Sequence, residues 1–124
     1  MQHTILILDD EARICETLVD YLVDCGHIVF AYQDVTAAMD ALGAHNFTTA
    51  IVDIRLPDTG GYAFIERASH IRPELRYIIH TGSLDFANGG LRHGEDDRIE
   101  AVLIKPLNRL QDFSDILERM GRAR

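Results

Sequence analysis

Short apolar runs alternate with segments of helical periodicity along this chain, and this alternation constrains its fold more than any other feature. Five runs have the length and composition of strands, at residues 4–8, 28–31, 48–53, 77–81 and 101–104. The first run is apolar at every position from Ile5 to Leu8, which is typical of a parallel strand buried on both faces. The pattern therefore predicts a sheet with helices on both sides.

Segments of helical spacing fill the intervals between these runs. In the first interval Cys15, Leu18, Leu22 and Cys25 recur at positions that share one face of a helix, and Gly26 follows as a C-cap. Helices are expected from Glu11 to Cys25, from an N-cap at Asp34 to Gly43, over 62–70, over a short stretch around 84–92, and along a closing apolar stripe from Leu110 to Met120.

Five strands that alternate with about five helices indicate an α/β fold with a doubly wound parallel sheet. Right-handed crossovers and a length of 124 residues favour a flavodoxin-like sheet with the strand order 2-1-3-4-5. The sequence contains no repeat or linker, so residues 1–124 are expected to form a single domain. Ligands of such folds bind beyond the carboxyl ends of the strands, so the candidate functional residues are found there.

The chain is acidic, with 12 Lys and Arg residues against 20 Asp and Glu residues and a formal net charge of −8. Direct contact with nucleic acid is not expected, because that function usually needs a basic surface. The opening apolar run is too short for a signal-peptide core or a membrane span. At about 1.5 Å of rise per residue, Cys15 and Cys25 would lie about 15 Å apart, too far for a disulfide, so both are expected to be reduced and to face the core. These features predict a cytoplasmic protein without membrane contact.

Polar side chains follow four of the five expected strands, all at the carboxyl edge of the sheet. They are Asp9 and Asp10 after the first strand, Asp53 at the end of the third, Thr81 at the end of the fourth and Lys105 after the fifth. A lone Asp at a strand end is usually a turn residue or a helix cap. Complementary groups at four strand ends of one edge indicate a functional site instead.

The chemistry of these groups suits phosphoryl transfer. Three carboxylates at neighbouring strand ends repel one another unless a cation lies among them. An all-oxygen set favours Mg²⁺ or Mn²⁺ over Zn²⁺. Phosphoryl transfer mainly needs positioning and charge neutralisation, which the Lys105 ammonium and the Thr81 hydroxyl can supply. A carboxylate that attacks phosphorus would form an acyl phosphate.

The motifs around these residues resemble those of response regulator receiver domains of two-component signalling, over essentially the whole chain. The matching motifs are Ile-Leu-Ile-Leu-Asp9-Asp10-Glu11, Ile51-Val52-Asp53-Ile54-Arg55-Leu56-Pro57, Gly61, Thr81-Gly82 and Lys105-Pro106.

The resemblance implies a role for each matched position. Asp53 would accept a phosphoryl group from a phosphohistidine of a sensor histidine kinase or phosphotransfer protein. The ligands of Mg²⁺ would be Asp9, Asp10, Asp53 and the backbone carbonyl of Arg55. Thr81 and Lys105 would contact phosphoryl oxygens, and the Lys105–Pro106 bond would be cis.

The resemblance also implies a signalling switch rather than an enzyme with a separate substrate. The domain would assist its own phosphorylation and dephosphorylation, and would then change its contacts with an output protein or a fused domain. Formation of a homodimer is compatible with this interpretation.

Four features depart from the family pattern. Val102 stands where Tyr or Phe is common, so the usual coupling of an aromatic ring to the hydroxyl residue cannot operate. Gly60 replaces an aspartate that often begins the third helix, and Arg55 places a cation beside the phosphoacceptor. The stretch from Leu84 to Glu100 is polar and contains glycine, which predicts a mobile output face.

Two other functions fit parts of the pattern. A phosphatase of the haloacid dehalogenase type would use a similar fold, Mg²⁺ and a nucleophilic Asp. Its motif is Asp-x-Asp directly after the first strand, whereas Asp9 and Asp10 are adjacent. A pseudo-receiver would bind partners without phosphorylation; the complete set of site residues argues against it, and Val102 keeps it open.

Overall fold

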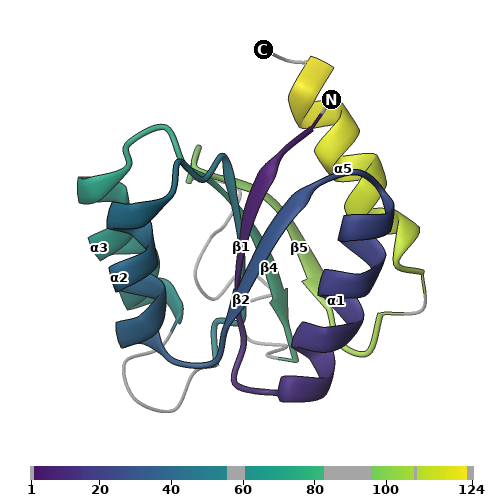
Figure 1. Ribbon diagram of the computed structural model, residues 1–124, viewed down its shortest axis with the longest axis horizontal. Helices are drawn as coiled ribbons and strands as arrows, with labels where there is room; N and C mark the ends of the chain where they lie inside the picture. Colours follow the sequence, from purple (N-terminus) through teal and green to yellow (C-terminus); the bar gives the residue numbers. More distant parts are fainter. Residues whose placement is uncertain (1, 56–60, 83–95, 108, 123–124) are drawn as a thin grey trace.

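The computed structural model of the chain is a five-stranded parallel sheet between two layers of helices (Figure 1). It describes residues 2–55, 61–82, 96–107 and 109–122. The strand order is β2-β1-β3-β4-β5, and all neighbouring strands are parallel. This order confirms the flavodoxin-like topology predicted from the sequence.

The described elements follow the predicted alternation of strands and helices. They are β1 (Thr4–Leu8), α1 (Ala12–Asp24), β2 (Ile28–Tyr32), α2 (Val35–Ala44), β3 (Thr49–Val52), α3 (Gly61–Ile71), β4 (Arg76–Thr81), β5 (Ile99–Ile104) and α5 (Gln111–Arg122).

Two predictions fall wholly or partly outside the described residues. The short helix expected around 84–92 lies outside them, as do Pro57 and Gly60. Of the polar stretch from Leu84 to Glu100, only 96–100 is described, and Ile99 and Glu100 begin β5. Ile99 pairs with Tyr77 of β4, whereas the mobility predicted for this stretch stays a prediction.

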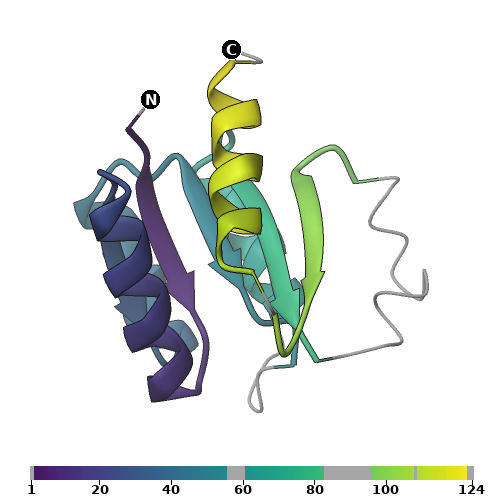
Figure 2. The same cartoon turned by 90° about the vertical axis from the view of Figure 1, so that its right-hand side faces the viewer.

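The core is divided into two layers because successive strand residues point to opposite faces of the sheet. Leu6 and Tyr77 pack on one face with α2 and α3, whereas Ile7 and Ile78 pack on the other face with α1 and α5. Figures 1 and 2 show these helix pairs on either side of the sheet. The central strands β1, β3 and β4 are buried almost throughout, which explains their continuous apolar sequences.

Local signals explain two of the helix ends, the start of α2 and the end of α1. The Asp34 carboxylate accepts a hydrogen bond from the Ala37 N–H at 2.8 Å, which confirms the predicted N-cap of α2. Gly26 follows α1 with a φ of 96°, a left-handed conformation that favours glycine. The sequence predicted that α2 ends at Gly43. The helix instead continues to Ala44, and His45 is its C-cap.

The two cysteines have different surroundings. Cys15 is buried in α1, and burial raises the pKa of its thiol to about 11. Cys25 is exposed, so the prediction that both cysteines face the core is wrong for this residue. Cys25 is the C-cap of α1, and there it is open to solvent although its Sγ lies 3.4 Å from Ser114 Oγ of α5. Both thiols are free.

None of the helices in the described parts of the chain combines the length and the apolar character that a membrane crossing requires.

Candidate functional site

The candidate site lies at the carboxyl ends of β1 and β3, which are neighbours in the sheet. Asp9 follows β1 and Asp53 follows β3, and the two residues are only 2% and 5% exposed. Strand pairing continues to this point, because the Asp53 N–H donates to the Leu8 carbonyl at 3.0 Å. The carboxylates of Asp9, Asp10, Glu11 and Asp53 offer oxygens that all lie within 4.8 Å of one another. The predicted acidic residues are therefore brought together.

Each buried aspartate uses one oxygen to fix the turn that follows it. Asp9 Oδ1 accepts the Glu11 N–H at 3.0 Å, and Asp53 Oδ1 accepts the Arg55 N–H at 2.9 Å. Aspartate commonly makes this bond two residues along the chain, because its short side chain can reach the backbone there. In both residues Oδ2 is then left for other contacts.

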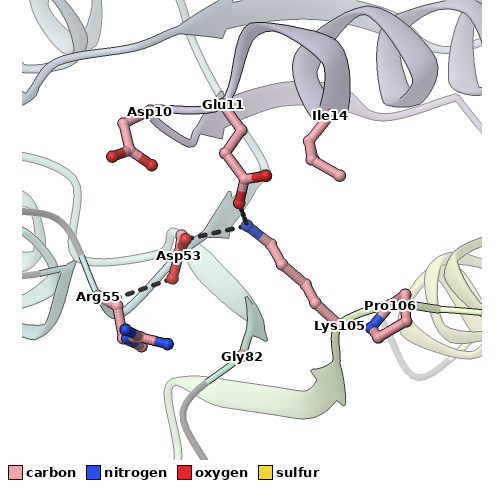
Figure 3. A pocket seen from close by; sticks show the side chains of 8 residues that line it. All are labelled: Asp10, Glu11, Ile14, Asp53, Arg55, Gly82, Lys105 and Pro106. Carbon is pink, nitrogen blue, oxygen red and sulfur yellow. Dashed lines mark hydrogen bonds and ion pairs between the residues drawn. The ribbon is translucent and has the colours of Figure 1, made fainter.

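Lys105, directly after β5, contacts Oδ2 of both aspartates. Its Nζ lies 2.8 Å from Asp9 Oδ2. It also lies 3.0 Å from Asp53 Oδ2 and 2.9 Å from Glu11 Oε1, the two contacts that Figure 3 shows. Burial by itself would lower the pKa of Lys105, but its hydrogen bonds to the three carboxylates outweigh burial and raise the pKa above its ordinary value. Lys105 is thus held as an ammonium ion between the strand ends.

The pKa of Asp9 is raised, and burial is the main cause. Hydrogen bonds from Lys105 and from the Glu11 backbone lower it, but they do not cancel the desolvation of a carboxylate that is almost fully enclosed. The negative charge of Asp53 raises it further. Enclosure by the sheet and the neighbouring turn, more than the negative charge of Asp53, therefore makes Asp9 easier to protonate.

A cavity of about 470 Å³ opens above these groups. Its lining residues are Asp10, Glu11, Ile14, Asp53, Arg55, Gly82, Lys105 and Pro106 (Figure 3). Arg55 brings a second cation to it, and a methyl group built on Gly82 would lie 3.6 Å from Arg55 Nη1. The cavity thus has carboxylates on its floor and cationic groups on its sides.

Thr81, the predicted hydroxyl donor, ends β4 and is fully buried, and Gly82 lines the cavity at this point. The Thr81 carbonyl accepts the Lys105 N–H at 2.9 Å, so the two residues are adjacent across β4 and β5. The Lys105–Pro106 bond is cis, as the resemblance implied. Val102, at the position that is often aromatic, is partly buried against the core layer of α2 and α3.

Glu11 is the site residue that the sequence reasoning missed. It stood in the opening motif but received no role, whereas the structure pairs it with Lys105. The available signal was a third carboxylate directly after the acidic pair, at the start of a helix.

The fold and the position of the site define a class of protein. In doubly wound α/β proteins, ligands bind at the carboxyl edge of the sheet, where the strand order reverses, and the acidic groups and Lys105 lie at that edge. Within this class, a family model described as the response regulator receiver domain matches residues 5–116. The chain therefore belongs to the receiver domain family of two-component response regulators, which interact with histidine kinases and output domains. This assignment argues against the phosphatase alternative.

Curated relatives and solved structures agree with this assignment. The chain is 30% identical over 117 residues to the response regulator receiver protein CpdR of Brucella abortus, with 94% of each chain covered. It is 27% identical to the regulatory protein VanRc of Enterococcus gallinarum, and the match covers 98% of this chain but only 52% of the relative. A receiver domain structure from Clostridium thermocellum has a TM-score of 0.82 and 26% identity, with 98% of this chain and 96% of that chain covered. The chain thus spans nearly all of one relative and about half of the other.

Proposed function

We propose that Asp53 accepts a phosphoryl group and that this domain acts as a phosphoacceptor switch, not as an enzyme with a separate substrate. The observation that carries the proposal is the contact of 3.0 Å between Lys105 Nζ and Asp53 Oδ2 at the floor of an open cavity. An ammonium beside a nucleophilic carboxylate is placed to neutralise the charge that a phosphoryl group brings.

The geometry distinguishes the two oxygens of Asp53. Oδ1 is engaged by the Arg55 N–H, whereas Oδ2 faces Lys105, so Oδ2 is the proposed attacking atom. Its attack forms a P–O bond to Asp53 and breaks the P–N bond of a phosphohistidine. The electron pair of the broken bond returns to the imidazole of the donor. The product is an acyl phosphate.

Lys105 and Thr81 are the proposed contacts of the phosphoryl oxygens. Lys105 keeps its charge because its pKa is raised, so it can neutralise one oxygen throughout the neutral pH range. Thr81 lies next to Lys105, because the Lys105 N–H donates to the Thr81 carbonyl. The Thr81 hydroxyl would donate a hydrogen bond to a second phosphoryl oxygen. Thr81 ends β4 and Lys105 directly follows β5, so the rigid sheet holds both residues in place.

Asp9, Asp10, Asp53 and the backbone carbonyl of Arg55 are the proposed holders of Mg²⁺ or Mn²⁺. The carboxylates fit a hard divalent cation because they offer only oxygen atoms within 4.8 Å of one another. When bound, such an ion supplies charge neutralisation at the phosphoryl oxygens.

The proposed phosphodonor is a sensor histidine kinase or a phosphotransfer protein in the cytoplasm. The proposed response is a change of contacts with an output protein or an attached output domain, and a homodimer is one form it could take. No direct contact with nucleic acid is proposed for the domain, which is consistent with its net charge of −8.

The test is the intact mass of the protein after incubation with acetyl phosphate, with and without Mg²⁺. The variant Asp53→Asn removes the acceptor, and Asp40→Asn on the exposed side of α2 is the matched control. We expect one Mg²⁺-dependent phosphoryl adduct in the wild type and in the control, and none in Asp53→Asn. A folded wild type that binds Mg²⁺ but gains no adduct would refute the proposal and favour the pseudo-receiver alternative.

A further inference from the structure

Glu11 has no role in the fold that explains its position in the site. It occupies the N-cap of α1, where Asp, Asn, Ser and Thr are favoured, and its side chain makes no capping hydrogen bond. The side chain instead extends across the cavity to Lys105 Nζ, at a distance of 2.9 Å (Figure 3). The contact joins the start of α1 to the end of β5, 94 positions apart in the sequence.

The contact with Glu11 completes the coordination of the ammonium. A lysine has three N–H donors, and Lys105 Nζ lies within 3.0 Å of carboxylate oxygens of Asp9, Glu11 and Asp53. An additional acceptor on a phosphoryl group therefore needs one of the three contacts to be released. Which contact is released depends on the cost of separating each pair.

Burial distinguishes the three partners of Lys105. The side chains of Asp9 and Asp53 are only 3% and 7% exposed, whereas that of Glu11 is 58% exposed. Breaking a buried pair leaves an uncompensated charge, but an exposed carboxylate is rehydrated when it leaves. Glu11 is thus the partner that costs least to separate.

We infer that Glu11 is a positioning residue, which occupies the third N–H donor of Lys105 in the unphosphorylated domain and releases that donor to the incoming phosphoryl group, while Asp9 and Asp53 keep the ammonium in place. The inference rests on the proposed function, because it assigns Lys105 to that group. It also means that the Glu11 carboxylate competes with an anionic donor for the same ammonium. Removal of this carboxylate should make the site easier to occupy.

The test compares Glu11→Gln with Glu16→Gln in phosphorylation by acetyl phosphate at fixed Mg²⁺. Glu16 is an exposed residue of α1 and loses the same charge without touching Lys105. We expect Glu11→Gln to lower the half-saturating concentration of acetyl phosphate by about twofold to fivefold at low salt, the range of an exposed ion pair. The saturating rate should change by less than about twofold, because Asp53 and Lys105 remain in place.

A third variant separates direct pairing from long-range charge. Glu11→Asp keeps the charge but is one methylene shorter, so it cannot reach Lys105 from the same position. The half-saturating concentration of acetyl phosphate for Glu11→Asp should therefore be closer to that of Glu11→Gln than to that of the wild type. The inference would be overturned if Glu11→Asp had the same half-saturating concentration of acetyl phosphate as the wild type. It would also be overturned if Glu11→Gln and Glu16→Gln had the same half-saturating concentration.

The ammonium can also be observed without phosphorylation, by NMR of the lysine Nζ protons. Lys105 should give slowly exchanging proton signals in the wild type and in Glu16→Gln, and these should be lost or broadened in Glu11→Gln. Unchanged signals in Glu11→Gln would refute the pairing. Failure of the proposed function would appear differently, as the absence of an Asp53 adduct in every variant.

Discussion

Gly61, the first residue of α3, packs directly against the carbonyl group of Asp53. A methyl group in place of its hydrogen would overlap that carbonyl oxygen and would lie 2.8 Å from both Ile54 Cα and Val52 Cγ1. The Gly61 N–H also donates to the Ile54 carbonyl at 3.1 Å. The start of α3 therefore supports the backbone that carries the candidate phosphoacceptor, and this position excludes a larger residue.

Substitution of Gly61 by Ala should destabilise the domain by about 1–3 kcal/mol, because the backbone next to Asp53 has to move. The same substitution at Gly43, inside α2 and with open space around it, should stabilise by about 0.5–1 kcal/mol. Urea denaturation measures both free energies of unfolding. Equal effects at the two positions would show that the contact with Asp53 has no energetic importance.

The sequence was sufficient to locate Asp9, Asp53 and Lys105, because the carboxyl ends of parallel strands share one edge. Once the strand order is inferred, residues directly after the strands must meet there. The spacing of the motifs also indicated Gly61, although only the structure shows the steric reason. This part of the site follows from topology and needs no knowledge of side-chain conformations.

The role of Glu11 could not be predicted in the same way. A glutamate has three side-chain torsions, and its direction depends on the turn that Asp9 forms and on the place of Lys105. Helix ends were uncertain for a related reason. The apolar spacing that includes Cys25 continues past the last residue of α1, so periodicity alone placed an exposed thiol in the core.

Binding of Mg²⁺ should stabilise the domain, by about 2.7 kcal/mol at a concentration one hundred times the Kd. Asp10→Asn should weaken this effect, since Asp10 contributes an exposed carboxylate to the cluster, whereas Asp40→Asn should not. Thermal unfolding with increasing Mg²⁺ measures the shift. Stabilisation of equal size in Asp10→Asn would exclude that residue as a ligand.

The pH dependence of Mg²⁺ binding should reflect Asp9. Burial raises the pKa of Asp9, so a proton competes with the metal at higher pH than at an ordinary aspartate. Affinity should therefore fall as the pH is lowered towards the raised pKa, and it should be restored as the pH increases. Calorimetric titration at several pH values measures this change. An affinity that remains constant until the pH is well below the ordinary range of aspartate would contradict it.

Arg98 should contribute more to stability than an ordinary surface arginine. It binds Asp96 through two nitrogens, at 2.9 and 2.6 Å, and also donates to Glu66 and Ser69 of α3. The hydrogen bonds from Arg98 lower the pKa of Asp96 to about 2. Arg98→Met should cost about 1–2 kcal/mol, because these bonds are charge-assisted and partly enclosed.

Arg109 is the matched control for Arg98. Its side chain is 63% exposed and its ion pairs with Asp112 and Asp115 have distances of 3.6 and 3.7 Å. Arg109→Met should change the free energy of unfolding by less than about 0.5 kcal/mol. Similar decreases in the free energy of unfolding for Arg98→Met and Arg109→Met would show that the hydrogen bonds of Arg98 add no stability beyond that of an exposed ion pair.

His80 should make the stability of the domain dependent on pH. The residue is 4% exposed on the α1 and α5 side of the sheet, and its ring packs edge-on against Phe113. Neither ring nitrogen has a hydrogen-bond partner among the described residues. Burial, with a further contribution from the charge of Lys105, lowers the pKa of His80 to about 4.

The sign of the effect follows from proton binding. Between about pH 6.5 and about pH 4, the unfolded chain protonates this imidazole and the folded chain does not. Protonation of His80 therefore does not affect the free energy of unfolding above about pH 6.5. As the pH falls from about 6.5 to about 4, the free energy of unfolding decreases by on the order of 2–3 kcal/mol. His80→Leu should remove this dependence and should stabilise the domain even at neutral pH, because it removes two buried polar atoms without partners. Exposed His70 provides the control, and His70→Gln should leave the profile unchanged. Denaturation midpoints between pH 4 and pH 8 measure all three profiles, and a His80→Leu profile as steep as that of the wild type would place the acid sensitivity elsewhere in the molecule.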